Sequence, residues 1–202
     1  MKMDCLLAGV GGQGTVLASR LIAQTAMEKG LSAHTSETIG MAQRGGSVTS
    51  QVRIGHTACA PAIPLGAADL IIGFEPAEAL RNLAYLSPSG ALILNRDPVR
   101  PVTSSLGQGY ALGEILAYLA KAAKRCIFID GEALCRAAGS GKVLNVIVLG
   151  VAAAEGLLPF TKDELLATML AHVPAKFVEL NKKAFAVGFE HKKYEQENGG
   201  AK

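Results

Sequence analysis

The feature that most constrains this chain is a run of glycines placed between an apolar stretch and a helical pattern. Residues 9–14 read GVGGQG and directly follow the apolar residues 5–8. From Val16 to Ala26 apolar residues recur at spacings of three to five, which predicts a helix that ends near Gly30. A strand, a tight glycine turn and a helix in this order open many α/β domains. The start of the chain therefore predicts an α/β fold.

Strand-like and helix-like segments alternate along the rest of the chain. Strands are expected at residues 4–8, 33–37, 47–54, 69–74, 91–95 and 126–130. Helices are expected from Pro76 onward and at residues 112–123, 131–138, 143–154, 165–173 and 176–187. The sequence SPSG at residues 87–90 predicts a turn before the strand that follows it.

The segment at residues 47–54 indicates which kind of sheet these strands form. Val48, Val52 and Ile54 alternate with polar residues, as in a strand with one exposed face. Such a strand suits a mixed sheet better than a wholly parallel one. We therefore expect an α/β fold, a three-layer α/β/α sandwich with a mixed, mostly parallel sheet. It would form a single domain over residues 1–189, followed by a flexible tail at residues 190–202.

Composition limits the partners that the chain can have. Of its 202 residues, 50% are hydrophobic and 18% are charged, against about 25% charged in an average soluble protein. This low charge fits either a surface covered by another protein or an unusually large core. With a net charge of +3, no Trp and no basic stripe, nucleic-acid binding is not expected. The longest apolar stretch, residues 143–154, is too short to span a bilayer, so no membrane association is expected.

The cysteines and histidines follow no metal-binding pattern. The four cysteines, at positions 5, 59, 126 and 135, include no C-x-x-C pair, and the four histidines lie at no metal-binding spacing. Cys5 and Cys126 lie in apolar runs and are expected to be buried. We therefore predict no metal site and no catalytic residue in this chain. The cysteine pattern and the N-terminal sequence, which does not resemble a signal peptide, predict a cytoplasmic protein.

The glycine turn has two interpretations. It matches G-x-G-x-x-G, and its backbone could bind an anion at the start of the following helix, through Gly9, Gly11, Gly12, Gln13 and Gly14. Alternatively, it is a tight turn that packs helix against sheet without any ligand. In a dinucleotide-binding domain Glu37 would stand near the place of the acidic residue that holds the ribose. A second glycine-rich loop follows Glu37 at once and would crowd that ligand. A stand-alone dinucleotide-binding oxidoreductase is the alternative function.

The second glycine-rich segment reads GMAQRGGS. An arginine supplies a planar fork of donors and a glutamine supplies an amide, and flexible backbone on both sides would let them approach an anion or a partner. So many glycines are costly to order, which favours a functional role over a surface turn with a solvated arginine. The predicted interface or active-site loop comprises Gly40, Met41, Gln43, Arg44, Gly45, Gly46 and Ser47.

A third glycine-containing stretch, GSGK at residues 139–142, invites comparison with a phosphate-binding P-loop. That pattern needs a glycine where this chain has Arg136, and a serine or threonine where it has Val143. We therefore interpret residues 139–142 as a turn that starts a helix.

Taken together, several segments resemble the gamma domain of the 2-oxoacid:ferredoxin oxidoreductases, and within that family the small subunits of the indolepyruvate type. The segments are AGVGGQGTVLAS, GMAQRGGSVTSQVRIG, ADLIIGFEP, NVIVLG and ELNKKAFAVGFE. The resemblance runs from about Asp4 to Gly188. The order of the two glycine segments is its most specific part, and the identity of the 2-oxo acid, such as indolepyruvate or pyruvate, is its least specific.

The resemblance implies a chain that works only inside a complex. Such enzymes oxidatively decarboxylate a 2-oxo acid to an acyl-CoA and reduce ferredoxin. Thiamine diphosphate, Mg and the iron–sulfur clusters would lie in a large alpha subunit, and this chain would hold none of them. Coenzyme A is the phosphate-bearing cosubstrate that residues 9–14 would suit. The isolated chain is expected to be inactive and to form a homodimer. A binding module for a small anionic effector is a third interpretation.

Overall fold

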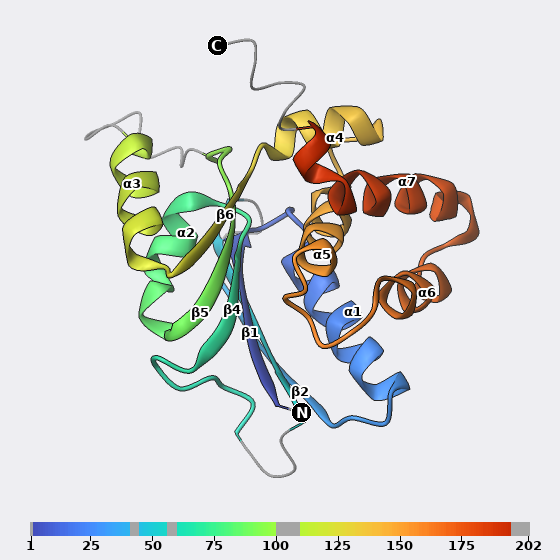
Figure 1. Cartoon of the computed structure of the whole chain (residues 1–202), viewed down its shortest axis with the longest axis horizontal. Helices are drawn as coiled ribbons and strands as arrows, with labels where there is room; N and C mark the ends of the chain where they lie inside the picture. The colour runs from blue at the N-terminus through green and yellow to red at the C-terminus, as the bar shows by residue number, and fades with distance from the viewer. Residues whose placement is uncertain (1, 41–44, 56–59, 100–109, 195–202) are drawn as a thin grey trace.

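The computed structural model describes residues 2–40, 45–55, 60–99 and 110–194. It contains a six-stranded sheet in the order β2-β3-β1-β4-β5-β6 (Figure 1). Its strands are β1 (Met3–Val10), β2 (Ala33–Ile39), β3 (Ser47–Ile54), β4 (Ala68–Gly73), β5 (Leu86–Asn95) and β6 (Arg125–Ile129). Strands β1, β4, β5 and β6 are parallel neighbours, whereas β3 runs antiparallel to both β1 and β2. The predicted mixed, mostly parallel sheet is confirmed.

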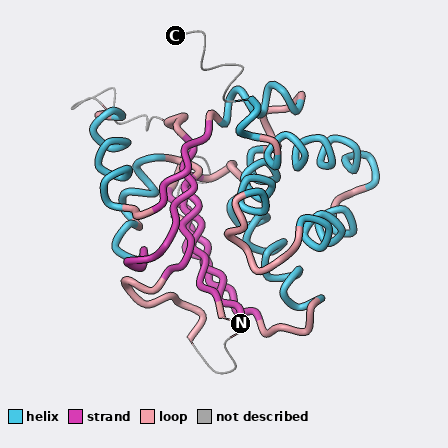
Figure 2. The backbone as a smooth tube through the Cα atoms, viewed as in Figure 1, coloured by secondary structure: helices cyan, strands magenta, loops and turns pink. Residues whose placement is uncertain are grey.

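Helices cover both faces of this sheet (Figures 1 and 2). On one face lie α1 (Thr15–Glu28), α4 (Gly131–Ala138), α5 (Leu144–Ala154), α6 (Lys162–His172) and α7 (Val178–Phe189). On the other face lie α2 (Pro76–Arg81) and α3 (Leu112–Ala122). Short 3-10 turns lie at Leu83–Tyr85 and Ala175–Phe177. This is the three-layer arrangement that the alternating pattern predicts.

The core is divided by the sheet into two apolar clusters. Leu7, Ile72 and Ile93 point to the larger cluster under α1, α5 and α7, whereas their neighbours Leu6 and Ile71 point to the smaller one under α2 and α3. This alternation follows from the two-residue period of a strand. Both sets of side chains are fully buried, so the central strands are apolar on both faces, as parallel strands in an α/β fold are.

Helix α5 is the most deeply buried helix on the larger cluster. Its residues from Asn145 to Ala152 are all buried, which confirms the core helix predicted at residues 143–154. It packs so closely against α7 that a Cβ atom added at Gly188 would lie 2.1 Å from the carbonyl oxygen of Ile147. Only a glycine fits there, so the crossing of the two helices depends on this residue.

Two details of the sequence reading differ from the structure. Residues 87–90 were expected to turn, but they belong to β5, which begins at Leu86, and the pairing with β4 shifts register between Ala68 and Leu70. Gly90 permits this irregular pairing, because a Cβ atom there would lie 2.7 Å from the Ala68 carbonyl oxygen. Residues 191–194, expected in the tail, are helical, and His191 is buried. The flexibility of residues 195–202 stays a prediction, since they lie outside the described residues.

The remaining findings concern cysteines and membranes. Cys5 is fully buried as expected, whereas Cys126 is only half-buried, and Cys59 lies outside the described residues. Among the helices of the described part of the chain, none is long and apolar enough to cross a bilayer.

Candidate functional site

The candidate site lies at the edge of the sheet where the parallel strands end. The chain leaves β1 toward α1 on one face of the sheet and leaves the neighbouring strand β4 toward α2 on the other face. In open α/β sheets, ligands bind outside the carboxyl ends of the strands at such a switch point. Residues 9–14, the first predicted site, lie here.

The first glycine loop is held by its own side chain and by neighbouring elements. Gln13 accepts a hydrogen bond from the Val10 N–H through Oε1 at 2.8 Å and donates from Nε2 to the Phe74 carbonyl at 3.1 Å. Gly14 caps α1 with φ 81°, and a Cβ atom there would lie 2.9 Å from Cγ of Asn145. Gly9 is as crowded, since a Cβ atom would lie 2.7 Å from Oε1 of Gln13. These contacts support the tight-turn interpretation for most of the loop.

Gly12 differs from the other loop glycines because it faces open space. It has φ 100°, and no atom lies within 4 Å of the position that a Cβ atom would take. The N–H groups in the first turn of α1 lie beside it. These N–H groups have no hydrogen-bond acceptor within the helix, because the first intrahelical hydrogen bond at this end runs from the Ala18 N–H to the Gly14 oxygen. Gly12 and the start of α1 are therefore the part of the loop that a ligand or partner can approach.

The second predicted segment lies directly against the first. Gly11 donates its N–H to the carbonyl oxygen of Gly46 at 2.9 Å, and Gly40 donates to the carbonyl oxygen of Ser47 at 2.8 Å. The described parts of the two glycine segments, which are separate in sequence, thus lie side by side. Met41, Gln43 and Arg44 lie outside the described residues, so their predicted role stays a prediction.

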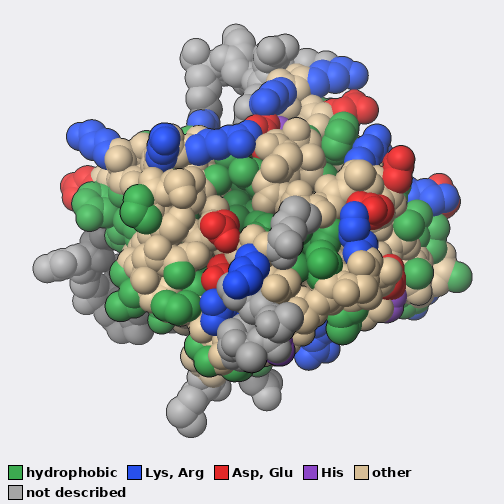
Figure 3. Space-filling model, turned by 60° about the horizontal axis from the view of Figure 1, so that its bottom comes forward, with side chains coloured by type: hydrophobic (Ala, Val, Ile, Leu, Met, Phe, Trp, Pro, Cys, Tyr) green, Lys and Arg blue, Asp and Glu red, His purple; other side chains and the backbone are tan. Residues whose placement is uncertain are grey.

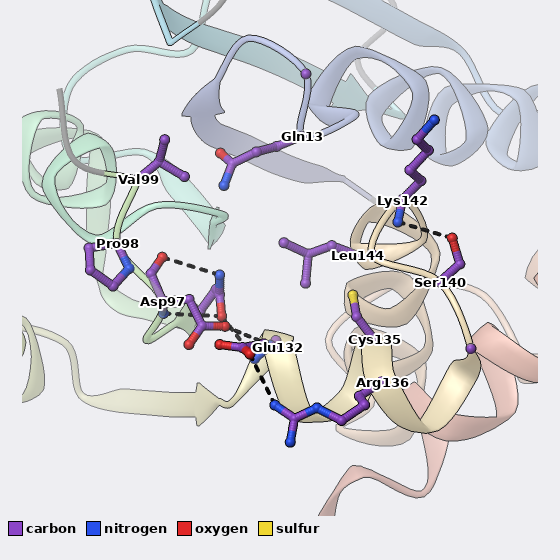
Figure 4. Close-up of a pocket in the computed structure, with 15 residues that line it drawn as sticks. Gln13, Asp97, Pro98, Val99, Glu132, Cys135, Arg136, Ser140, Lys142 and Leu144 are labelled. Carbon is purple, nitrogen blue, oxygen red and sulfur yellow. Dashed lines mark hydrogen bonds and ion pairs between the residues drawn. The ribbon is translucent and has the colours of Figure 1, made fainter. Parts of the chain in front are cut away.

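A cleft of about 590 Å³ opens beside Gly12 (Figure 4). Gln13 lines one side of it, the segment after β5 lines a second side, and the α4–α5 region lines the third. Its charged and polar lining includes Gln13, Asn95, Asp97, Glu132, Arg136, Ser140 and Lys142. The cleft gives this edge of the sheet room for a ligand of moderate size.

The two acids of the cleft are tied to the start of α4. Asp97 accepts the Glu132 N–H at 2.6 Å, and Glu132 pairs with Arg136 at 3.1 Å. Burial raises the pKa of the Asp97 carboxyl, the hydrogen bond from the Glu132 N–H opposes this, and the charges of Asp130 and Glu132 reinforce it. Figure 4 shows the Lys142 side chain directed away from Asp97 and Glu132, so its positive charge lies apart from these acids.

The GSGK stretch forms the predicted turn, but its position beside the cleft was not predicted. Gly139 ends α4 with φ 95°, and the turn leads into α5. These residues also line the cleft, across from Gly12. Asp97, which lies between the strand predicted at residues 91–95 and the helix predicted at residues 112–123, was not predicted as a site residue. The sequence could have indicated Asp97, because polar residues that directly follow a buried parallel strand lie at the carboxyl edge of the sheet.

The sheet order argues against a dinucleotide site. In the doubly wound dinucleotide fold, the acidic residue that holds the ribose lies at the end of the strand next to β1. Here β3 lies between β1 and β2, and Glu37 on β2 forms an ion pair with Arg20 at 3.6 Å. Glu37 is therefore one strand too far from the glycine loop for that role.

Exposed apolar side chains flank the glycine loop. Ile39 is 61% exposed and Leu17 is 46% exposed, and both line a groove of about 400 Å³ together with Gly11, Gly12 and Val48. We call Leu17 and Ile39 the apolar rim. On the face that Figure 3 shows, hydrophobic side chains form several separate patches between charged ones. The apolar rim stands out because it adjoins the two joined glycine segments.

No group of three or more His, Cys, Asp or Glu side chains placed to hold a metal ion occurs among the residues that the structure describes. The cysteine thiols of that part of the chain are free, and burial raises the pKa of Cys135, which lines the cleft.

Comparison with known proteins gives consistent matches over nearly the whole chain. The family model described as pyruvate ferredoxin/flavodoxin oxidoreductase matches residues 4–191. The chain is 39% identical over 191 residues to indolepyruvate oxidoreductase subunit IorB of Archaeoglobus fulgidus, covering 94% of each chain. It is 36% identical to the protein of the same name from Methanothermobacter thermautotrophicus, covering 94% of this chain and 97% of the relative.

Solved structures agree in fold. The gamma subunit of a keto/oxoacid ferredoxin oxidoreductase from Geobacter sulfurreducens superimposes with a TM-score of 0.67 at 25% identity, covering 95% of this chain and 96% of that one. A 2-oxoglutarate:ferredoxin oxidoreductase from Magnetococcus marinus matches with a TM-score of 0.69 at 17% identity. This chain corresponds to 31% of the Magnetococcus chain, and at that identity the match shows the fold alone.

Proposed function

The chain belongs to the pyruvate ferredoxin/flavodoxin oxidoreductase family, and from this premise we propose that it is the small subunit of an indolepyruvate-type 2-oxo acid:ferredoxin oxidoreductase. The family resemblance stated in the sequence analysis is confirmed by the family match over residues 4–191. The observation that carries the proposal is the pair of relatives named indolepyruvate oxidoreductase subunit IorB, which match this chain over 94% of its length.

The proposed complex oxidises a 2-oxo acid in the presence of coenzyme A. The carboxylate of the acid leaves as CO₂, the acyl carbon becomes bonded to the sulfur of coenzyme A, the thiol proton of coenzyme A is released, and two electrons pass to ferredoxin. Thiamine diphosphate, Mg and the iron–sulfur clusters belong to a large alpha subunit in this proposal. The small subunit would contribute a docking surface and a binding surface, with no residue that reacts with the acid.

We place the docking surface at the two joined glycine segments and the apolar rim. Exposed apolar side chains beside a backbone surface rich in glycine suit burial against another protein, because their removal from water favours association. Ile39 and Leu17 supply this apolar area next to Gly11 and Gly46. Ferredoxin would meet the complex through the large subunit.

We place a phosphate group of coenzyme A at Gly12 and the start of α1. The fit is partial, because the N–H groups of Val10, Gly11 and Gln13 already donate within the protein. The first-turn N–H groups of α1 are directed toward this end of the helix, where a negative charge is stabilised. The rest of the ligand could extend into the cleft.

The test uses the chain alone and co-expressed with its large subunit. Reduction of ferredoxin or a viologen dye is followed with indolepyruvate, pyruvate or 2-oxoglutarate in the presence of coenzyme A. We expect the complex to be coloured and to prefer indolepyruvate, and the isolated chain to be colourless and inactive. Dye reduction by the isolated chain would overturn the proposed subunit role, and a preference for pyruvate would overturn the substrate assignment.

The same preparation tests the dinucleotide alternative by calorimetry. A micromolar affinity for NAD, about −8 kcal/mol, would make that alternative the better one. We expect no such binding because Glu37 lies one strand away from the glycine loop and is paired with Arg20.

A further inference from the structure

Two carboxylates lie buried at the carboxyl end of β4, next to the joined glycine segments. Glu75 is 2% exposed and Glu78 is 4% exposed. Glu75 caps α2 by accepting the Glu78 N–H at 2.9 Å, and its other oxygen accepts the hydroxyl of Tyr110. The Tyr110 oxygen in turn accepts the Ala77 N–H at 3.0 Å. Glu75 thus joins the start of α2 to the segment that leads into α3.

Tyr110 donates its hydroxyl to Glu75 from a partly buried position. Burial raises the pKa of its phenol, and the hydrogen bond to Glu75 and the charge of that carboxylate raise it further. Tyr110 therefore keeps the proton that it donates to Glu75, and this contact holds one end of the acidic pair in place.

Glu78 makes the contact that reaches the second glycine segment. Its Oε2 accepts the hydroxyl of Ser47 at 2.7 Å, and its Oε1 accepts a hydrogen bond from Arg81. Ser47 is the first residue of β3 and follows Gly46, whose carbonyl accepts the Gly11 N–H. A continuous set of contacts therefore runs from Glu78 through Ser47 and Gly46 to Gly11.

A buried acid in this position is not what stability alone would favour. Burying a carboxylate costs free energy, and an apolar side chain of similar size is often as stable or more stable. Arg81 compensates the charge of Glu78 from a side chain that is 61% exposed. Instead, Glu75 and Glu78 accept hydrogen bonds from groups on α2, at the start of β3 and in the segment before α3. All of these groups lie beside one cavity of about 440 Å³. This arrangement favours a role for the two glutamates in holding these three parts of the chain in position.

We propose that Glu78 is a positioning residue: through Ser47 it holds the second glycine segment against the first, in the arrangement that the large subunit recognises. The inference rests on the proposed function, since it assigns the large subunit as the partner of this surface. Glu78 itself need not touch the partner, because its effect is transmitted by the hydroxyl of Ser47.

Ser47 provides the cleaner variant because it is exposed, so its replacement should leave folding intact. We expect Ser47→Ala to weaken the affinity for the large subunit about tenfold, since a hydrogen bond to a charged group is lost. Ser47→Thr keeps the hydroxyl and should restore most of the affinity. Ser36→Ala, in the paired strand β2 of the same hairpin, is the matched control and should bind normally.

A double variant tests whether Glu78 acts through Ser47. If it does, Ser47→Ala combined with Glu78→Gln should bind no more weakly than the more affected of the two single variants. Fully additive losses would overturn the transmission through Ser47. Affinity is measured by titration of the separately purified large subunit, and the melting temperature of each small-subunit variant is measured alongside.

The outcomes separate this inference from the proposed function. Ser47→Ala with unchanged melting temperature and weakened binding, rescued by Ser47→Thr, supports positioning. Wild-type affinity in Ser47→Ala overturns it, as does failure of Ser47→Thr to rescue the loss. If the wild-type complex forms but oxidises no 2-oxo acid, the proposed function fails, while the binding data still decide the role of Glu78.

Discussion

The backbone N–H of Gly11 donates a hydrogen bond of 2.9 Å to the carbonyl oxygen of Gly46. These glycines belong to two segments that the sequence presents as separate motifs, 35 positions apart by their residue numbers (46 − 11). The bond shows that they form one surface. Any partner or ligand that meets one segment is therefore close to the other, and changes in either should have related effects on assembly.

Gly14→Ala and Gly12→Ala form a matched pair for the first glycine loop. Both residues have positive φ, which costs about 1–2 kcal/mol for a residue with a side chain. A methyl group at Gly14 would also press on Asn145, whereas Gly12 faces open space. We expect a loss of about 2–5 kcal/mol in the free energy of unfolding for Gly14→Ala and about 1–2 kcal/mol for Gly12→Ala. Urea denaturation measures both, and equal losses would mean that the packing against Asn145 contributes nothing.

Ile39→Asp tests the apolar rim. Ile39 is 61% exposed at the end of the edge strand β2, so the variant should change folding stability by no more than about 0.5 kcal/mol. We expect it to weaken binding of the large subunit and to shift the homodimer predicted for the isolated chain to monomer, because a charge replaces apolar contact area. Light scattering and titration measure the two effects. Tyr118→Asp on α3, 59% exposed on the other side of the sheet, is the control, and equal losses in both variants would contradict a specific rim.

Arg44→Ala tests the second glycine segment in the complex. Arg44 lies outside the described residues, so this prediction rests on the sequence. We expect an unchanged melting temperature and a loss of about 2–5 kcal/mol in affinity for the large subunit, as for a charged group at a desolvated interface. Arg44→Lys should recover only part of the loss because it lacks the planar fork of donors. A lower melting temperature with normal complex activity would make Arg44 a structural residue instead.

Glu164→Gln tests the contact between α1 and α6. A hydrogen bond from Lys29, 2.5 Å away, and hydrogen bonds from Thr161 lower the pKa of the Glu164 carboxyl from 4.5 to about 2. Because the folded-state pKa is the lower one, the stabilisation is present above pH 4.5 and is lost as the pH falls toward 2. Wild-type stability should therefore fall more steeply than that of Glu164→Gln between these pH values.

The control for this pH dependence is Lys29→Met, which removes the largest cause of the lowered pKa. It should reproduce most of the flatter profile of Glu164→Gln when the melting temperature is followed from pH 5 to pH 2. Parallel profiles for wild type and Glu164→Gln would show that the contact between Lys29 and Glu164 does not contribute in solution.

The sequence by itself determined the local units of this protein. The glycine at position 14, with φ 81°, and the capping box of Thr161 and Glu164 both lie at helix starts, where conformation depends on neighbouring residues. The apolar runs of β1 and β4 and the alternation in β3 predicted a mixed α/β sheet. The family resemblance came from the same segments. Local chemistry of this kind acts over a few residues, so it can be read from the order of amino acids.

Tertiary structure alone decided which of these units meet. The antiparallel strand β3 inserts between β1 and β2, and this pairing places Gly46 against Gly11 and removes Glu37 from the glycine loop. Glu78 reaches Ser47 across 31 positions, a contact that no local spacing indicates. Such contacts follow from the strand order that buries apolar surface best over the whole chain, and the free energy of that choice is distributed among many distant residues.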